Sequence, residues 1–332
     1  MSTPDTSVAQ HIDQFRERFT RITQEVGRRI VGAEDIVNMT VTSLLAGGHV
    51  LLEGIPGVGK TSLVHTLADV LHLTFSRIQF TPDLMPADIV GTNIVQEHAH
   101  GGTYFEFQPG PIFANVVLAD EINRATPKTQ SALLEAMQEK TVSVGKTTYT
   151  LEQPFLVLAT QNPLEMEGTY PLPEAQLDRF FFKLKIQYPT EEAMHMILDR
   201  TTQVEQATVS RVVDGAEILE MRRIARGVPI ARPVQGYAIR LTLGTHPSSP
   251  HATPLIKKYV RYGASPRASQ ALVLAAKIQA LTRGNAFVSA DDIRAVALPV
   301  LRHRVLMNFE GEADEVNTDT LVNELISSVS AD

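Results

Sequence analysis

Hydrophobic residues recur along the N-terminal part of the chain in two different patterns. Between residues 8 and 28 they lie three and four positions apart, which predicts an amphipathic helix. A second helix is predicted over 34–46, where Gly47-Gly48 interrupts the pattern. Short apolar runs without this spacing predict buried strands at 50–53, 75–80, 116–120, 155–160 and 180–186.

Helical patterns also occur between several of these strands, at 62–72 and 126–138. Strands that alternate with helices predict an α/β fold with a parallel sheet covered on both faces. Beyond residue 189 the strand patterns fade, and helices are predicted at 191–208, 214–226, 234–245, 253–261, 267–282, 289–307 and 318–329. We therefore predict two domains, a core over 1–189 and a helical domain over 190–332.

Two stretches interrupt the alternation of strands and helices. Residues 81–113 are rich in proline and glycine, and a hairpin is predicted around Gly101-Gly102. Residues 141–153 alternate between apolar and polar positions around Gly145-Lys146, which predicts a β-hairpin.

Composition and charge exclude several classes of protein. The 332 residues include 37 acidic and 30 basic ones, giving a formal net charge of −7. All residues after Arg304 together contain seven acids and no lysine or arginine, so the rest of the chain is balanced, which argues against a broad basic face for nucleic acid. The acidic tail is either a solvated segment or a docking surface for a basic partner.

Other absences from the sequence narrow the chemistry and the location. The lack of cysteine excludes a disulfide scaffold and thiol catalysis. The first residues do not form a signal peptide, and no apolar run approaches the roughly 20 residues that span a bilayer, so a soluble cytoplasmic protein is expected. His98 and His100 lie in the loop-rich stretch, and without an H-E-x-x-H motif we expect no histidine metal site.

Residues 54–61 (GIPGVGKT) fit the phosphate-binding pattern G-x-x-x-x-G-K-[ST], between a predicted strand and a predicted helix. Backbone N–H groups and the helix N-terminus favour an anion there. Lys60 would reach the β- and γ-phosphates, and the Thr61 hydroxyl would ligate Mg²⁺. The predicted phosphate-binding residues are Gly54, Pro56, Gly57, Val58, Gly59, Lys60, Thr61 and Ser62.

The predicted strand at 116–120 ends in two acids, Asp120 and Glu121. A parallel sheet delivers them to its carboxyl edge, where open α/β sheets bind ligands. We expect Asp120 to hold Mg²⁺ through water, and Glu121 to accept a proton from, or orient, an attacking water. Asn162 follows the next strand and either bridges the γ-phosphate and this water or only forms an Asn-Pro turn.

Three arginines are candidates for phosphate contacts. Arg179 precedes the fifth strand, where its planar fork would suit phosphate oxygens, although an ion pair with Asp178 or Glu174 explains it equally from the residues alone. Arg267 lies at a predicted helix start, where the dipole disfavours a cation unless an anion binds nearby. Arg124 is the third candidate.

These motifs, in this order, resemble those of the AAA+ ATPases and, more narrowly, of the MoxR family, over nearly the whole chain. The strings at 79–91 (QFTPDLMPADIVG) and 107–113 (FQPGPIF) are the most family-specific. The others lie at 30–32 (IVG), 120–125 (DEINRA), 161–163 (QNP), 177–180 (LDRF) and 263–267 (GASPR).

The resemblance implies a five-stranded sheet in the order 5-1-4-3-2, an insert at 81–113, a hairpin at 141–153 and a helical lid. It implies that ATP and Mg²⁺ bind, with the adenine at Val31 and Gly32. It also implies a ring, usually hexameric, in which a neighbour donates Arg179. Asn162 corresponds to the first sensor and Arg267 to the second, which acts in its own subunit or across the interface. Arg124 receives no role.

The predicted function is therefore an ATP-hydrolysing chaperone that remodels or matures partner proteins, often partners with a von Willebrand factor A domain. Two alternatives remain at this point. One is a nucleotide-gated binding module without significant turnover. The other is a nucleic-acid-dependent motor, against which the balanced charge argues. A GTPase would require an Asn-Lys-x-Asp string, which the sequence lacks.

Overall fold

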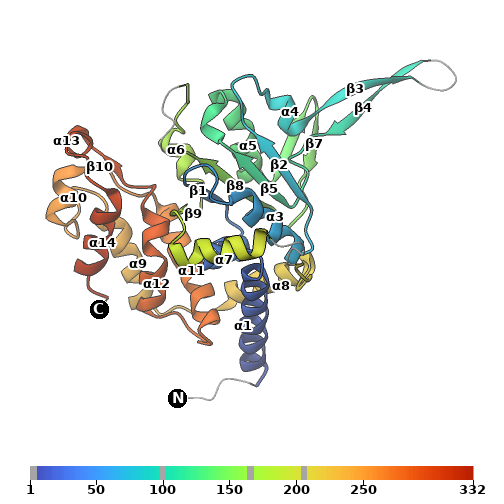
Figure 1. Cartoon of the computed structure of the whole chain (residues 1–332). Coiled ribbons are helices and arrows are strands. Elements are labelled where there is room, and N and C mark those ends of the chain that lie inside the picture. The colour runs from blue at the N-terminus through green and yellow to red at the C-terminus, as the bar shows by residue number, and fades with distance from the viewer. Residues whose placement is uncertain (1–5, 98–101, 163–167, 203–207, 332) are drawn as a thin grey trace.

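The computed structural model describes residues 6–97, 102–162, 168–202 and 208–331. Its centre is a parallel sheet of five strands in the order β2-β5-β8-β1-β9 (Figure 1). The strands are β1 (Val50–Glu53), β2 (Phe75–Gln79), β5 (Val116–Asp120), β8 (Leu156–Gln161) and β9 (Phe182–Lys185). Counted along the chain as the first to fifth sheet strands, they follow the order 5-1-4-3-2. The predicted α/β fold class is confirmed.

The central strands are apolar throughout because helices cover both faces of the sheet. Successive side chains point to opposite faces. Leu51 and Val117 belong to one buried cluster, whereas Val50, Val116 and Leu156 belong to the other. With both faces occupied by packing, the carboxyl edge of the sheet is left for the polar residues that follow each strand.

Helices that precede β9 in the chain form part of both clusters. They are α1 (Thr6–Gly27), α2 (Glu34–Ala46), α3 (Lys60–Val70), α4 (Pro86–Val90), α5 (Pro127–Glu139) and α6 (Glu174–Leu177), with the 3₁₀ turn η1 (Ile122–Arg124). Helices α4 and α5 cover one face, and α1 to α3 cover the other. The apolar stripe predicted for the first helix is buried along α1, at Ile12, Phe15, Phe19, Ile22 and Val26.

The C-terminal part is mostly helical and packs against the same cluster as α1 and α2. Its helices are α7 (Glu191–Thr201), α8 (Gly215–Gly227), α9 (Arg232–Gly244), α10 (Pro254–Tyr259), α11 (Pro266–Thr282), α12 (Ala290–Leu301), α13 (Phe309–Ala313) and α14 (Thr318–Ser328). Among the helices of the described ranges, none combines the length and the apolar character needed to cross a membrane.

Three predicted helices in this part are too long. The helix predicted at 191–208 ends at Thr201. Strand β10 (Val260–Tyr262) pairs with β11 (Leu306–Met307), so the helices predicted at 253–261 and 289–307 end at Tyr259 and Leu301. Helix α12 ends at Leu301 because the Arg304 side chain donates hydrogen bonds to backbone carbonyls just before β9. Helices α4, α6 and α13 were not predicted because four or five residues are too few to show a helical period.

Two hairpins extend from the core. Strands β3 (Gly91–Glu97) and β4 (Thr103–Pro109) form a long antiparallel ribbon that projects from the sheet (Figure 1). Strands β6 (Thr141–Val144) and β7 (Thr147–Thr150) form a shorter one. Phe107 stacks on Tyr149 with ring centroids 4.0 Å apart, which joins the two hairpins. The predicted turn residue Gly101, both His98 and His100, and Pro163 lie outside the described residues.

The base of the long hairpin requires glycine. Gly91 has φ +94°, and a Cβ at this position would lie 2.3 Å from the carbonyl oxygen of Gln108. A Cβ on Gly110 would lie 2.3 Å from the carbonyl oxygen of Ile89. The two backbone segments therefore approach more closely than any side chain allows, which fixes the direction in which the hairpin leaves the core.

His49, just before β1, makes the stability of the core depend on pH. Its Nδ1 accepts the Val157 N–H (3.0 Å) and its Nε2 donates to the Met137 carbonyl (3.1 Å), so the buried ring is neutral. Burial lowers its pKa from 6.5 to about 4. The unfolded chain takes up this proton at higher pH than the native protein does. Stability from this group is therefore complete above pH 6.5 and is lost as the pH falls toward 4.

We expect the free energy of unfolding to drop by about 3 kcal/mol between pH 7 and pH 4 on account of His49 alone. Urea unfolding at half-unit pH intervals measures this slope. His49→Gln, whose amide can still donate to Met137, should unfold with a shallower pH dependence in this window. An identical slope in the two proteins would contradict the assignment.

Candidate active site

The phosphate loop leaves β1 and ends where α3 begins at Lys60. Gly57 and Gly59 have φ values of +84° and +78°, which residues with side chains rarely adopt. A Cβ at either position would meet nothing within 4 Å, so this part of the loop is open. Lys60 Nζ donates to the Gly54 carbonyl at 2.6 Å, which places the ammonium group over the loop.

A cavity of about 490 Å³ adjoins this loop, within the usual range for small-molecule sites. Gly57, Val58, Gly59 and Ser62 line its polar end. The remainder is mostly apolar and includes Ile30, Val31, Gly32, Tyr188, Met194 and Ile197. Such a cavity can take a molecule with an anionic end and a flat apolar end. It contains Val31 and Gly32, the positions predicted to hold the adenine.

Asp120 and Glu121 lie at the carboxyl end of β5, and Thr160 of the neighbouring strand β8 links them. The Thr160 hydroxyl donates to Asp120 Oδ1 at 2.6 Å and accepts the Glu121 N–H at 2.8 Å. Glu121 itself is in the left-handed region, with φ 57° and ψ 49°. This strained conformation costs a residue with a side chain about 1 kcal/mol or more, and such residues concentrate at functional sites.

A network of side chains holds both acids. Arg77 donates to Asp120 Oδ2 from Nη2 (2.6 Å) and Nε (3.2 Å). Gln79 accepts from Arg77 Nη2 (2.8 Å) and donates to Glu121 Oε2 (2.9 Å). Arg124 Nε reaches the same Glu121 oxygen at 3.2 Å. Sequence reasoning left Arg124 without a role and missed Arg77, Gln79 and Thr160.

Asn162 is brought to the same edge of the sheet. It follows β8, which lies between β5 and β1. The N–H of Gly54 donates to the carbonyl of Gln161 at 3.3 Å, so Asn162 directly follows a residue bonded to the start of the phosphate loop. Asn162 is buried, with 6% of its surface exposed. The carboxyl edge of the sheet therefore gathers Lys60, Asp120, Glu121 and Asn162.

Arg179 lies at the other end of the strands, at the amino edge of the sheet. Phe181, two residues later, donates its N–H to the carbonyl of His49 (2.8 Å), and His49 immediately precedes β1. Arg179 Nη1 donates to the Leu134 carbonyl at 3.0 Å, and the residue borders a hollow of about 400 Å³ with Glu135 and Glu139. Since parallel strands run the same way, Arg179 is at the amino ends while the phosphate loop is at the carboxyl ends.

Arg267 lies on the same side as Arg179, because it pairs with Asp178, the residue that precedes Arg179 in the chain. The Asp178 carboxylate accepts from Ser265 Oγ (2.8 Å) and Arg304 Nε (2.9 Å), and Arg267 Nη1 is 3.5 Å away. Asp178 is thus paired with Arg304 and Arg267, and Arg179 bonds to a carbonyl instead of forming the local ion pair that the sequence allowed.

Arg304 fixes the turn that carries Arg179. Its guanidinium donates to the carbonyls of Asp178 (3.2 Å), Phe180 (2.5 Å) and Phe181 (3.3 Å), and to that of Val300. Burial lowers its pKa to about 10, and the Asp178 carboxylate opposes this shift. Arg304 therefore remains charged at neutral pH and locks the turn between α6 and β9 to the end of α12.

Comparison with known proteins agrees with this geometry. Residues 49–182 match the family described as "ATPase family associated with various cellular activities (AAA)", and residues 253–325 match the AAA lid domain. "Chaperone MoxR1" of Mycobacterium tuberculosis is 44% identical over 305 residues, covering 92% of this chain and 80% of that protein. The chain belongs to the MoxR family of AAA+ ATPases.

Other relatives extend over similar lengths. "Protein MoxR" of Methylorubrum extorquens is 28% identical and covers 96% of this chain and 95% of its own length. "Uncharacterized protein YeaC" of Bacillus subtilis is 42% identical and covers 92% of each. A crystal structure of a protein from Cytophaga hutchinsonii, provisionally described as an ATPase, has a TM-score of 0.91 at 41% identity and covers 98% of both chains.

The residues of this MoxR-family site fit a magnesium nucleotide. Thr61, at the exposed start of α3, and Asp120 offer the oxygen atoms that Mg²⁺ prefers. The open glycine loop offers N–H groups to phosphates. Thr61 and Asp120 would hold the metal, and Lys60 would lie beside the phosphates.

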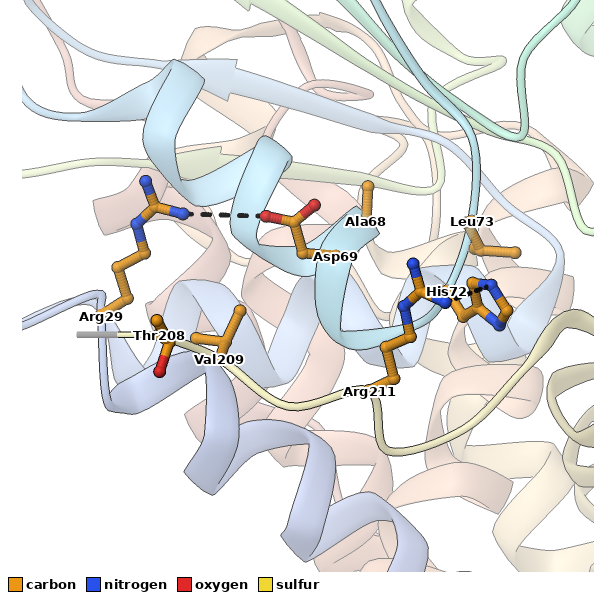
Figure 2. A pocket seen from close by; sticks show the side chains of 8 residues that line it. All are labelled: Arg29, Ala68, Asp69, His72, Leu73, Thr208, Val209 and Arg211. Carbon is orange, nitrogen blue, oxygen red and sulfur yellow. Dashed lines mark hydrogen bonds and ion pairs between the residues drawn. The ribbon is translucent and has the colours of Figure 1, made fainter. Parts of the chain in front are cut away.

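A second hollow, of about 410 Å³, lies at the other end of α3 (Figure 2). Its charged side chains pair with one another. Arg29 is 3.7 Å from Asp69, and Arg211 donates to Nε2 of His72 at 2.9 Å. It is lined by the C-terminal end of α3 and by residues near 208–211, away from Lys60 and the strand-end acids. Among the described residues, those that line this second hollow include none of the predicted phosphate-binding positions.

Proposed function

We propose that this protein hydrolyses ATP at sites shared by neighbouring protomers of a ring and uses the hydrolysis to remodel partner proteins.

ATP and Mg²⁺ are its expected ligands. The family supports ATPase chemistry, and the chaperone name of the Mycobacterium tuberculosis relative supports action on other proteins.

The observation that carries this proposal is the division of the site between opposite edges of the sheet. Lys60, Asp120 and Glu121 follow the carboxyl ends of β1 and β5, whereas Arg179 precedes the amino end of β9. Four residues of β1 alone separate these edges by roughly 13 Å. Arg179 therefore contacts the phosphate of an adjacent protomer. Arg267, which pairs with Asp178 beside Arg179, contacts the same phosphate.

Each residue of the proposed site then has a chemical task. Lys60 and the loop N–H groups bind the phosphates, and Thr61 and Asp120 hold Mg²⁺, which when bound would neutralise charge on the phosphate oxygens. Glu121 accepts the proton of the attacking water. Asn162 offers an amide that can donate to the γ-phosphate and accept from the water. Arg179 of the adjacent protomer stabilises the charge that develops on the transferred group.

The proposed output is movement of the helical lid and the hairpins. We place the boundary between core (1–189) and lid (190–332) just after β9, the last strand of the sheet. On the projecting hairpin, Val95 and Phe105 lie opposite each other, and 61% and 76% of their surfaces are exposed. Exposed apolar pairs of this kind suit contact with a partner protein. A hexameric ring and a partner with a von Willebrand factor A domain are the forms we propose.

Release of inorganic phosphate tests the proposal. The purified protein should release phosphate from ATP in the presence of Mg²⁺, and its specific activity should fall on dilution as protomers separate. Mass photometry at the same concentrations shows whether activity follows assembly. Nucleotide binding without phosphate release at any concentration would favour a switch without turnover. Activity that is constant on dilution while the assembly dissociates would exclude the shared site.

A further inference from the structure

Arg77 lies where it can control access to Asp120. Strand β2 is an edge strand of the sheet, and Arg77 and Gln79, two positions apart, point to the same face. The register pairs Gln79 with Asp120 of β5, so the Arg77 side chain runs along the strand toward the acid. No part of the predicted motif set includes Arg77.

Both oxygens of the Asp120 carboxylate already accept hydrogen bonds. Oδ2 accepts two N–H groups of Arg77, at 2.6 and 3.2 Å, and Oδ1 accepts the Thr160 hydroxyl at 2.6 Å. The arginine also opposes the negative charge that would attract a cation. A magnesium ion with its water shell therefore competes with Arg77 for Oδ2.

The two partners differ in their freedom to move. The side chain of Asp120 is 14% exposed and is held by Thr160 of the adjacent strand. The side chain of Arg77 is 47% exposed and lies on the edge of the sheet. When a cation arrives, Arg77 can swing into solvent at little cost, whereas Asp120 stays in place.

We propose that Arg77 gates the magnesium site, by occupying the Asp120 carboxylate until the metal displaces it. This inference rests on the proposed nucleotide site. The same displacement breaks the bond from Arg77 to Gln79, whose amide holds Glu121. Arrival of the metal thereby frees Gln79, which contacts the residue that activates water, from one of its two bonds. Arg77 is a positioning residue in this scheme, since it contacts neither phosphate nor water.

The test compares nucleotide affinity with and without the metal. The probe is mant-AMP-PNP, a fluorescent analogue that is not hydrolysed, titrated once in MgCl₂ and once in EDTA. Arg77→Gln should bind the probe about two- to fivefold more tightly than the unmodified protein in MgCl₂, the range for ion pairs of this exposure. In EDTA the two proteins should bind it equally. Arg77→Ala, which removes every contact, should behave in the same way.

A matched control is available in the lid. Arg294 pairs with Asp291 at 2.6 Å, and its side chain is 42% exposed, close to the value for Arg77. Arg294→Gln removes the same charge from α12 and should leave both affinities unchanged. Equal or weaker binding of Arg77→Gln in MgCl₂ would overturn the gate and indicate that Arg77 only orients Asp120.

The outcomes also distinguish failure of this inference from failure of the proposed nucleotide site on which it rests. If the unmodified protein does not bind mant-AMP-PNP in either buffer, the nucleotide site is wrong and the gate is wrong with it. If the probe binds and magnesium strengthens binding equally in all variants, the nucleotide site stands and only the gate is refuted. Weaker binding of Arg77→Gln confined to EDTA also refutes it, because Arg77 would then contact phosphate.

Discussion

Replacing Glu121 with glutamine should reduce the rate of ATP hydrolysis by about 10²- to 10⁴-fold while leaving nucleotide affinity within a small factor. The amide has the shape of the carboxylate but cannot accept a proton from water. The left-handed backbone at Glu121 and its contacts with Gln79 and Arg124 hold this side chain at the carboxyl end of β5. Phosphate release and mant-AMP-PNP binding, measured on the same sample, separate turnover from binding.

A control for this change is Glu17→Gln on the exposed surface of α1, which removes one carboxylate of the same kind far from the site. It should hydrolyse ATP at the unmodified rate. An unchanged turnover number in Glu121→Gln would remove Glu121 from the reaction. Because the inactive variant should keep ATP bound, it is also the form with which partner proteins can be captured.

Replacing Arg179 with alanine should lower turnover by about 10³- to 10⁵-fold, the range for an arginine inserted beside a transferring phosphate. Removal of its hydrogen bond to the Leu134 carbonyl should cost little stability, because Arg304 and Asp178 hold the turn. Arg179→Lys should also be slow, because an ammonium group lacks the planar fork. Mass photometry should show that Arg179→Ala forms the same assembly as the unmodified protein, so that lost turnover is not due to lost assembly.

Mixing two inactive variants gives the decisive experiment. The Lys60→Ala protomer has a defective phosphate loop but keeps Arg179. The Arg179→Ala protomer has an intact phosphate loop but lacks the arginine. Where an Arg179→Ala loop faces the arginine of a Lys60→Ala protomer, the site is complete. Mixed assemblies should therefore recover hydrolysis that neither variant has alone. An arginine that acts within its own chain would give no recovery, since no protomer in the mixture has both residues.

Much of the fold could be predicted because its signals are local. The five sheet strands begin as short apolar runs, and burial of both faces makes the three central strands, β5, β8 and β1, apolar up to their polar ends. Gathering of Lys60, Asp120 and Asn162 at one edge also follows from sequence, since parallel strands end on the same side. The end of α12 could not be predicted, because Arg302 to Arg304 continue a helical pattern and leave it only through contacts with the turn near residue 180.

The missed site residues share a physical reason. Arg77 and Gln79 lie on β2, and they meet Asp120 and Glu121 only because β2 pairs with β5. Thr160 meets the same acids from β8. In the sequence Arg77 and Gln79 look like the solvent face of an edge strand. Their alternation with Ile78 at the start of the 79–91 string was the available signal. Its role becomes clear only from the pairing of β2 with β5, which is distant in sequence.

The placement of the phosphate loop and Arg179 at opposite edges of one sheet has a consequence for assembly. In the proposed assembly each protomer presents two different half-sites, so the contact is heterologous and repeats from one protomer to the next. A closed circle completes every half-site, whereas an open row leaves an unmatched loop at one terminus and an unused arginine at the other. Closure of the circle, rather than the number of members, thus decides whether every bound nucleotide can be cleaved.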